Sequence, residues 1–299
     1  MRYSILWDML KKFEGNPILK PIPGNSWESR CVFNCASFYD GGRAHIIYRA
    51  MGSDNISRLG YASSSDGFHV DERLQQPVFS PGNELEARGC EDPRITKIGQ
   101  EYFMFYTAYG DTAQVAQVTI KVDDFLGKKW DWGKRVYPFP GVQNKDVAIF
   151  PEKINGRWVI YHRIPPHIWV SYSDDLFHWK DSNIIMMPRS NGWEKLKIGA
   201  GAPPVKTPRG WLFIYHGVDE ARVYRLGFAL VALDDPEAIL YRTREPILEP
   251  TEEFEKEGDV PNVVFTCGAF VKNERLFVHY GGADKVICVA TQKLDDLLP

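Results

Sequence analysis

The stretch VFNCASFYDGGRAHIIYR, at residues 32–49, has the pattern of a β-hairpin: an apolar strand, a tight turn, and a second strand that closes on Tyr48 and a cation. Four later stretches repeat this pattern, at residues 93–109, 150–163, 202–217 and 267–282. Their closing tyrosines lie about 55 to 65 residues apart, and strand-based units at such a period are typical of propeller blades. The repeat predicts one array of like units whose first strands meet at a common centre.

Each hairpin continues into a third strand that runs toward a polar turn, and four copies add a proline-bounded fourth segment. Proline is tolerated at strand edges, where no partner needs its missing N–H. The fifth copy runs out of chain before its fourth segment, whereas an extra copy, PILKP, stands at residues 17–21 ahead of the first hairpin. Pairing the two ends would remove an open edge. The sequence therefore predicts an all-β, five-bladed β-propeller with four antiparallel strands per blade, closed by its N-terminal strand.

Length and composition favour a single catalytic domain over residues 1–299, because no linker or low-complexity tract divides the chain. A net charge of −3 and a pI of about 6.2 give no footprint for nucleic acid or an anionic membrane. Residues 1–14 have helical apolar spacing interrupted by charges, which predicts a helical N-terminal extension rather than a signal peptide. With no long apolar run, we expect a cytoplasmic protein, and the apolar extension suggests a possible homo-oligomer.

Five cysteines occur without CxxC spacing or a matching His/Cys pair, and all stand in or beside apolar runs. They are expected to be buried thiols, and no metal site is predicted. The acidic run TEEFEKEGD at residues 251–259 is expected to be a solvated loop.

Polar residues are concentrated where the inner strands begin, and Asp92 in GCEDPRI stands out among them. Glu91 beside it and a partly dry funnel would raise the pKa of Asp92, which suits a general acid. The alternative is a structural aspartate in a strand-entry turn, paired with Arg94.

A set of cations follows on the third and fourth copies. Such crowding costs energy unless an anion lies among the charges, although solvated surface charges paired with acids would give the same composition. The members of this set are Lys145, Arg163, Lys206 and His216.

Several motifs in order along the whole chain resemble glycoside hydrolase family 130. They are GCEDPRI (89–95), NKDVAIFPEKINGRW (144–158), KIGAGAPPVKT with GWLFIYHGV (197–218), and VPNVVF with YGGAD (260–284). The family consists of inverting β-mannoside phosphorylases with a minority of β-mannosidases. The resemblance implies a five-bladed propeller that cleaves β-mannosides with inorganic phosphate, releasing α-mannose 1-phosphate, with no other cofactor.

The resemblance also implies roles for individual residues. Asp92 matches the catalytic acid, and the four cations match phosphate-holding positions, with Lys145 where the family often has Arg. A lysine is a point charge without the bidentate fork of arginine. The candidate substrate-binding residues are Asn34, Arg49, Arg58, Glu91 and Asp284, of which Asn34, Arg49 and Asp284 match positions around the mannosyl unit and Glu91 has an open role.

Inverting hydrolysis needs a second carboxylate about 6.5–9.5 Å from the acid to activate water. Cations at the matching positions favour phosphate as the nucleophile instead, but Asp146 and Glu152 keep an inverting β-mannosidase open as the alternative. A non-catalytic glycan-binding propeller is the second alternative. The expected partners are a small β-mannoside and phosphate, and the linkage, β-1,2 or β-1,4, is left open.

Overall fold

The computed structural model describes residues 10–299, and strands, nearly all of them paired antiparallel, make up about half of these residues. In the first half of the chain, consecutive strands pair as two meanders, β2-β3-β4 and β6-β7-β8. A single parallel pair, Ser57 with Gly89, joins these meanders into one sheet. The strands of this half are β2 (Cys31–Asp40), β3 (Arg43–Met51), β4 (Ser57–Ser64), β5 (Glu72–Arg73), β6 (Gly89–Ile98), β7 (Glu101–Tyr109) and β8 (Ala113–Lys121).

Three further sheets follow, ordered β9-β10-β11-β12, β13-β15-β16-β17 with β14 paired to β15, and β18-β19-β20-β1. Their strands are β9 (Lys145–Ile149), β10 (Trp158–Ile164), β11 (His167–Ser173), β12 (Lys180–Met186), β13 (Lys197–Ala200), β14 (Val205–Thr207), β15 (Gly210–Val218), β16 (Tyr224–Val231), β17 (Ile239–Arg242), β18 (Val264–Lys272), β19 (Arg275–Gly282), β20 (Val286–Lys293) and β1 (Lys11–Lys12). The helices are short: η1 (Glu84–Glu86), α1 (Val122–Leu126), α2 (Glu253–Lys256) and α3 (Leu294–Leu297).

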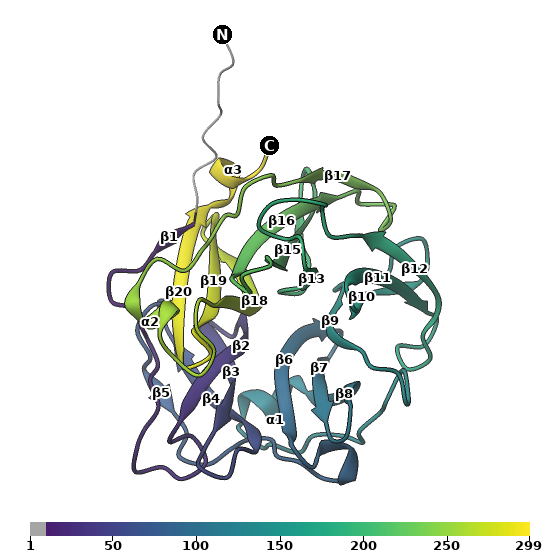
Figure 1. The fold of residues 1–299 in the computed structure, drawn as a ribbon. Coiled ribbons are helices and arrows are strands. Elements are labelled where there is room, and N and C mark those ends of the chain that lie inside the picture. The colour runs from purple at the N-terminus through teal and green to yellow at the C-terminus, as the bar shows by residue number, and fades with distance from the viewer. Residues whose placement is uncertain (1–9) are drawn as a thin grey trace.

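Figure 1 shows the sheets arranged around one centre, with β2, β6, β9, β13 and β18 on the inner side. The five hairpins expected from the repeat are all present, and the prediction of an all-β fold is confirmed. Apolar side chains pack between neighbouring sheets; one cluster joins Tyr161 of β10 to Phe213 of β15. The five cysteines are unpaired and buried, as predicted. Among residues 10–299, no helix has the length and apolar character needed to cross a membrane.

The outer edge of the last sheet is built from the N-terminal part of the chain. Lys11 and Lys12 pair with β20, and Leu19 in the PILKP segment forms a bridge with Ile287. The helix predicted for residues 1–14 falls largely outside the described residues, and where the structure describes it the prediction is wrong, because residues 11–12 form β1. The edge of β20 supplies partners for this backbone, whereas a short isolated helix is marginal in water.

A buried glutamate recurs beside four of the five closing tyrosines, which we call the carboxylate box. In each box the tyrosine hydroxyl donates to the glutamate, and an arginine or lysine pairs with the same carboxylate. The boxes are Glu28–Tyr48–Arg73, Glu86–Tyr106–Arg135, Glu194–Tyr215–Arg242 and Glu255–Tyr280–Lys12. In the third unit Tyr161 donates to the carbonyl of Pro236 instead. The expectation of a solvated loop at residues 251–259 is wrong at Glu255, which is fully buried in the last box.

We expect Glu194→Gln to lower the free energy of unfolding by about 3 kcal/mol, because it leaves two partly buried arginines without their buried counter-charge. Glu194 lies 2.7 Å from both Arg189 and Arg242 and accepts the Tyr215 hydroxyl at 2.8 Å. Chemical denaturation followed by fluorescence measures the change. Glu152→Gln is the matched control, since Glu152 is half-exposed and its removal should change stability by less than about 0.5 kcal/mol. Equal losses in the two variants would contradict a stabilising role for the box.

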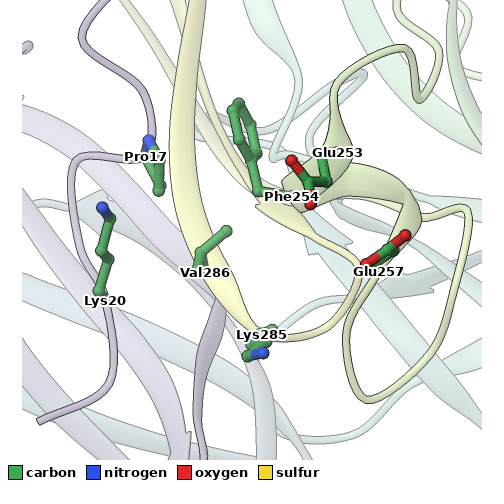
Figure 2. A pocket seen from close by; sticks show the side chains of 7 residues that line it. All are labelled: Pro17, Lys20, Glu253, Phe254, Glu257, Lys285 and Val286. Carbon is green, nitrogen blue, oxygen red and sulfur yellow. The ribbon is translucent and has the colours of Figure 1, made fainter.

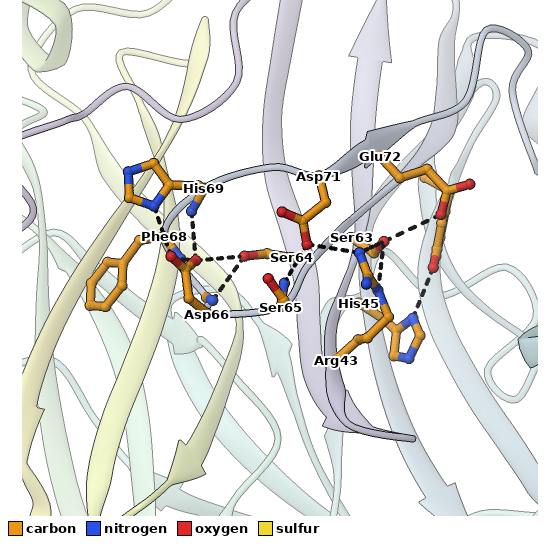
Figure 3. A network of polar contacts seen from close by, with 12 residues as sticks. Arg43, His45, Ser63, Ser64, Ser65, Asp66, Phe68, His69, Asp71 and Glu72 are labelled. Carbon is orange, nitrogen blue, oxygen red and sulfur yellow. Dashed lines mark hydrogen bonds and ion pairs between the residues drawn. The ribbon is translucent and has the colours of Figure 1, made fainter.

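Two polar turns after third strands share one geometry, of which Figure 3 shows the first. The carboxylate of Asp66 accepts the backbone N–H groups of Phe68 and His69 and lies 2.8 Å from the His69 ring. Asp175 makes the same contacts with the turn that contains His178. These hydrogen bonds hold the pKa of both aspartates well below its ordinary range. The motif closes a turn at the surface, and none of the candidate site residues takes part in it.

Candidate active site

Three inner strands each carry a β-bulge that contains an Asn or Asp with positive φ. These residues are Asn34 (φ 45°), Asp92 (φ 51°) and Asp146 (φ 59°). Asn and Asp tolerate the left-handed region better than other non-glycine residues, and a bulge redirects a side chain out of the regular alternation. All three side chains are buried, and the Asn34 amide donates to Asp92 Oδ1 at 3.0 Å.

Asp92 is held on one side by an arginine that bridges two carboxylates. The Arg49 guanidinium lies 3.1 Å from Asp92 Oδ1 and 2.6 Å from Glu91 Oε1, over the ring of Phe33. Its Nε donates to the Ser57 hydroxyl at 2.9 Å. Among residues 10–299 no hydrogen bond or ion pair reaches Asp92 Oδ2. The acid is therefore fixed through one oxygen, which leaves the other to face a ligand.

The expectation that Glu91 and burial raise the pKa of Asp92 is wrong for this structure. Burial favours the protonated form, but the nearby charges of Arg49, Lys145 and Arg94 lower the pKa below its ordinary value. Burial and the adjacent Asp92 instead raise the pKa of Glu91, against the attraction of Arg49. The sequence showed the neighbouring carboxylate, whereas the arginine that compensates it comes from another strand.

A cationic cluster surrounds Asp146, which Arg94 connects to Asp92. Asp146 Oδ2 lies 3.1 Å from Arg163 and 3.8 Å from His216, and Arg94 lies 3.5 Å from Oδ1. Burial, together with the neighbouring cations, holds the pKa of His216 well below its ordinary value, so a neutral imidazole faces Arg163 at 3.2 Å. Arg163 Nε and His216 Nδ1 are buried without a hydrogen-bond partner within the described residues. Lys145 lies near enough for its charge to lower the pKa of both Asp146 and Asp92.

Lys206 does not join this cluster. Its ammonium pairs with Glu152 at 2.5 Å in a half-exposed position, and Lys206 itself is on β14. The structure brings Lys197 to the site instead, at the start of β13 and above the ring of Tyr224. Burial and the charges of Arg163 and Lys145 lower the pKa of Lys197 to about 8. The assignment of Lys206 is corrected because Lys206 and Lys197 stand at opposite ends of β15, which pairs Lys206 with Trp211 and Lys197 with Val218.

Gly199 leaves room for His216 and Asp146 to lie close to each other. A Cβ at this position would lie 2.5 Å from the His216 ring and 2.6 Å from Asp146 Oδ2. Gly199 therefore serves close packing, and any side chain here would push the imidazole away from the carboxylate.

The remaining candidates differ in their placement. Asp284 is partly buried and has a φ of 51°. Burial and the nearby charge of Asp92 raise its pKa to about 7, against the opposing charge of Arg49. Arg58 makes its contacts elsewhere, with Asp54 at 2.8 Å and with the Ile56 carbonyl. The structure thus gathers Asn34, Arg49, Glu91 and Asp284 near Asp92, while Arg58, on β4, pairs with Asp54 in the preceding loop.

Hollows outside this group also occur. Figure 2 shows one between Pro17 and Lys20 of the N-terminal segment and Glu253 of α2. It lies against the outer part of the last sheet and includes none of the candidate residues. A different hollow, lined by Lys197, Tyr224 and Asn262, adjoins the cationic cluster.

Comparison with known proteins places these residues in a family. A family model described as β-1,4-mannooligosaccharide phosphorylase matches residues 9–299. Two proteins of Thermoanaerobacter sp. (strain X514) are similar: a 1,2-β-oligomannan phosphorylase, 46% identical over 96% of this chain and 98% of its own, and a β-1,2-mannobiose phosphorylase, 45% identical over 94% and 96%. The solved complex of a β-1,2-mannobiose phosphorylase from Listeria innocua with β-1,2-mannobiose superimposes with a TM-score of 0.86 at 27% identity, covering 96% of this chain and 98% of that one. The chain belongs to glycoside hydrolase family 130, and both Thermoanaerobacter relatives are glycoside phosphorylases.

Proposed function

We propose that residues 10–299 form a five-bladed β-propeller that catalyses inverting phosphorolysis of β-1,2-linked mannosides, giving α-mannose 1-phosphate. The five meanders around a common centre, with the N-terminal segment on the edge of the last, support the propeller. The relatives named for β-1,2-linked substrates support the linkage, since they share 45–46% identity with this chain. The chemistry is supported by the site itself.

One observation carries the proposal: a carboxylic acid group and a cationic cluster stand next to each other on the inner strands. Asp92 on β6 and Asp146 on β9 are linked through Arg94, which donates to the Asp92 carbonyl at 3.0 Å and pairs with Asp146. Beyond Asp146, the buried Nε of Arg163 has no hydrogen-bond partner among residues 10–299. A phosphate bound here would satisfy these groups and offset the crowded positive charge.

In the proposed reaction, phosphate bound by Arg163, Lys145 and Lys197 attacks the anomeric carbon of the mannosyl unit. The bond from that carbon to the glycosidic oxygen breaks on the opposite face, and Asp92 gives its proton to the departing oxygen, directly or through a sugar hydroxyl. The products are α-mannose 1-phosphate and a mannoside shortened by one unit. Asp284 and Asn34 lie where the mannosyl unit would be held.

Phosphate binding would also prepare the acid. Lys145 is among the charges that lower the pKa of Asp92, and its charge also lowers the pKa of Asp146 in the cationic cluster. A phosphate dianion beside Lys145 offsets that positive charge, so the pKa of Asp92 rises when the co-substrate is present. Protonation of Asp92 is in this way coupled to phosphate binding at the cationic cluster.

The hydrolase alternative needs a carboxylate that can activate water, and the two open candidates are poorly placed. Asp146 is locked between Arg94 and Arg163, and these cations outweigh burial and hold its pKa well below its ordinary value, which makes it a weak base. Glu152 is half-exposed and paired with Lys206, away from Asp92. Phosphate is therefore the nucleophile that this geometry favours.

The test incubates the enzyme with β-1,2-mannobiose and β-1,2-mannotriose, with and without inorganic phosphate. We expect α-mannose 1-phosphate to accumulate only with phosphate, and its α-configuration to be visible by proton NMR. Release of free mannose at the same rate without phosphate would contradict the proposal and favour the hydrolase. β-1,4-mannobiose is the control for linkage and should be cleaved much more slowly.

A further inference from the structure

A carboxylate lies inside the cationic cluster that is proposed to bind phosphate. Asp146 is buried, and its Oδ2 atom lies 3.1 Å from Arg163 and 3.8 Å from the His216 ring. Burial favours the protonated acid, but the charges of Arg163 and Arg94 hold the pKa of Asp146 well below its ordinary value, so the group is ionised at neutral pH. A negative charge at this place weakens the binding of any anion unless the two groups share a proton.

The backbone at this position does not require a carboxylate. Asp146 has a φ of 59° in the bulge of β9, and Asn34 has a φ of 45° in the bulge of β2. Asparagine and aspartate both tolerate this left-handed region. An amide at position 146 would keep the size of the side chain and remove the repulsion of an anion. The carboxylate differs from the amide in accepting hydrogen bonds with both of its oxygens, and this difference points to its function.

The polar atoms left unpaired in the cluster are two donors and one acceptor. Arg163 Nη1 lies 3.2 Å from His216 Nε2, and because a guanidinium only donates, the proton of the neutral imidazole is on Nδ1. Arg163 Nε and His216 Nδ1 are therefore buried donors without a hydrogen-bond partner among residues 10–299. Asp146 Oδ2 is a buried acceptor in the same condition, since its contact with Arg163 lacks hydrogen-bond geometry. A ligand that satisfies this set accepts hydrogen bonds and also donates one.

This requirement separates two oxyanions that have the same shape. Hydrogen phosphate carries one O–H, which can donate to a carboxylate while the remaining oxygens accept from the cations. Sulfate is a tetrahedral dianion of similar size, but it has no proton at neutral pH. One of its oxygens would face Asp146 Oδ2 as a second acceptor, so the two negative atoms would repel each other and Oδ2 would stay unpaired. Sites that hydrogen-bond an O–H group of a ligand strongly reject the analogue that lacks it.

We propose that Asp146 is a specificity-determining residue, which accepts the hydrogen bond of hydrogen phosphate and excludes sulfate from the cationic cluster; the proposal rests on the function proposed above. The positive charges give the cluster its affinity for an anion, and the carboxylate determines which anion binds. Gly199 leaves the space beside Oδ2 without a side chain, because a Cβ there would lie 2.6 Å from that oxygen. Arsenate also carries a proton at neutral pH and is accepted for the same reason as phosphate.

The test measures binding of phosphate, arsenate and sulfate to the sugar-free enzyme by calorimetric titration at neutral pH. We expect the wild type to bind phosphate and arsenate at least about 100-fold more tightly than sulfate, because sulfate leaves a buried acceptor unpaired. In Asp146→Asn the preference for phosphate over sulfate should fall about tenfold or more, the effect of losing one hydrogen bond to a charged group. The inhibition constant of sulfate against phosphate, measured in phosphorolysis of β-1,2-mannobiose, gives the same ratio for the wild type.

Asp92→Asn is the matched control, because it also turns a buried carboxylate with positive φ into an amide, under the charges of Lys145 and Arg94. It should keep the wild-type preference for phosphate over sulfate. If Asp146 only balances the charge of the cluster, Asp146→Asn binds both anions more tightly by the same factor, and the unchanged preference would overturn the proposal.

The wild type alone also decides the matter, whether or not Asp146→Asn folds. Sulfate that binds the wild type as tightly as phosphate would overturn the role of Asp146 as the residue that excludes it. A wild type that binds neither phosphate nor arsenate would instead overturn the proposed function itself, so the two failures are distinguishable.

Discussion

Asp92→Asn should reduce phosphorolysis of β-1,2-mannobiose by about 10³-fold or more, within the range general-acid catalysis contributes. The asparagine can keep the contacts that Asp92 Oδ1 makes with Asn34 and Arg49, so the fold and the site should stay intact. It has no proton to give to the departing oxygen. Initial rates of α-mannose 1-phosphate formation at saturating phosphate measure the effect.

The choice of leaving group separates loss of the acid from loss of the site. An aryl β-mannoside with an acidic phenol needs little protonation, so Asp92→Asn should lose far less activity on it than on mannobiose. Calorimetric titration should show that phosphate still binds, because the cationic cluster is untouched. A variant that cleaves mannobiose at near wild-type rate would contradict the assignment of Asp92 as the acid.

The repeat unit was predictable because strand alternation and the closing tyrosines are local properties of the sequence. The carboxylate boxes were not recognised, although the sequence contains a trace of them: Trp27-Glu28, Trp193-Glu194 and Phe254-Glu255 each place a glutamate after an aromatic residue. A glutamate in a polar segment normally indicates solvent exposure. Only the fold shows that these carboxylates turn inward to a tyrosine and a cation.

The candidate site, like the fold, was predictable from the sequence only in part. Asp92 and Arg163 could be found because each belongs to a copy of the repeat, Asp92 on the inner strand β6 and Arg163 on β10, which pairs with the inner strand β9. The pKa of Asp92 could not be predicted, since Arg49 and Lys145 approach it from other strands. Lys197 was missed, because sequence order does not show which end of β15 lies beside the cationic cluster.

Lys197→Ala should raise the KM for phosphate about 10- to 100-fold, and Lys206→Ala should leave it unchanged. The Lys197 ammonium stands close enough to Arg163 and Lys145 for their charges to lower its pKa, and removing one of several charged hydrogen-bond donors to an anion costs about 1.5–3 kcal/mol. Lys206 is engaged with Glu152 at the other end of the hairpin. Phosphorolysis rates at varied phosphate and fixed mannobiose measure both variants. The reverse result, with Lys206→Ala impaired and Lys197→Ala normal, would restore the assignment made from sequence.

The pH dependence gives an independent readout of the same lysine. Burial and neighbouring cations lower the pKa of Lys197 to about 8, so it is charged below pH 8 and becomes neutral above it. In the wild type the KM for phosphate should therefore rise as the pH passes through about 8, since the site loses one positive charge. In Lys197→Ala this rise should disappear, because the charge is absent at every pH. A wild-type KM for phosphate that stays flat from pH 7 to 9.5 would show that Lys197 does not contribute its charge to phosphate binding.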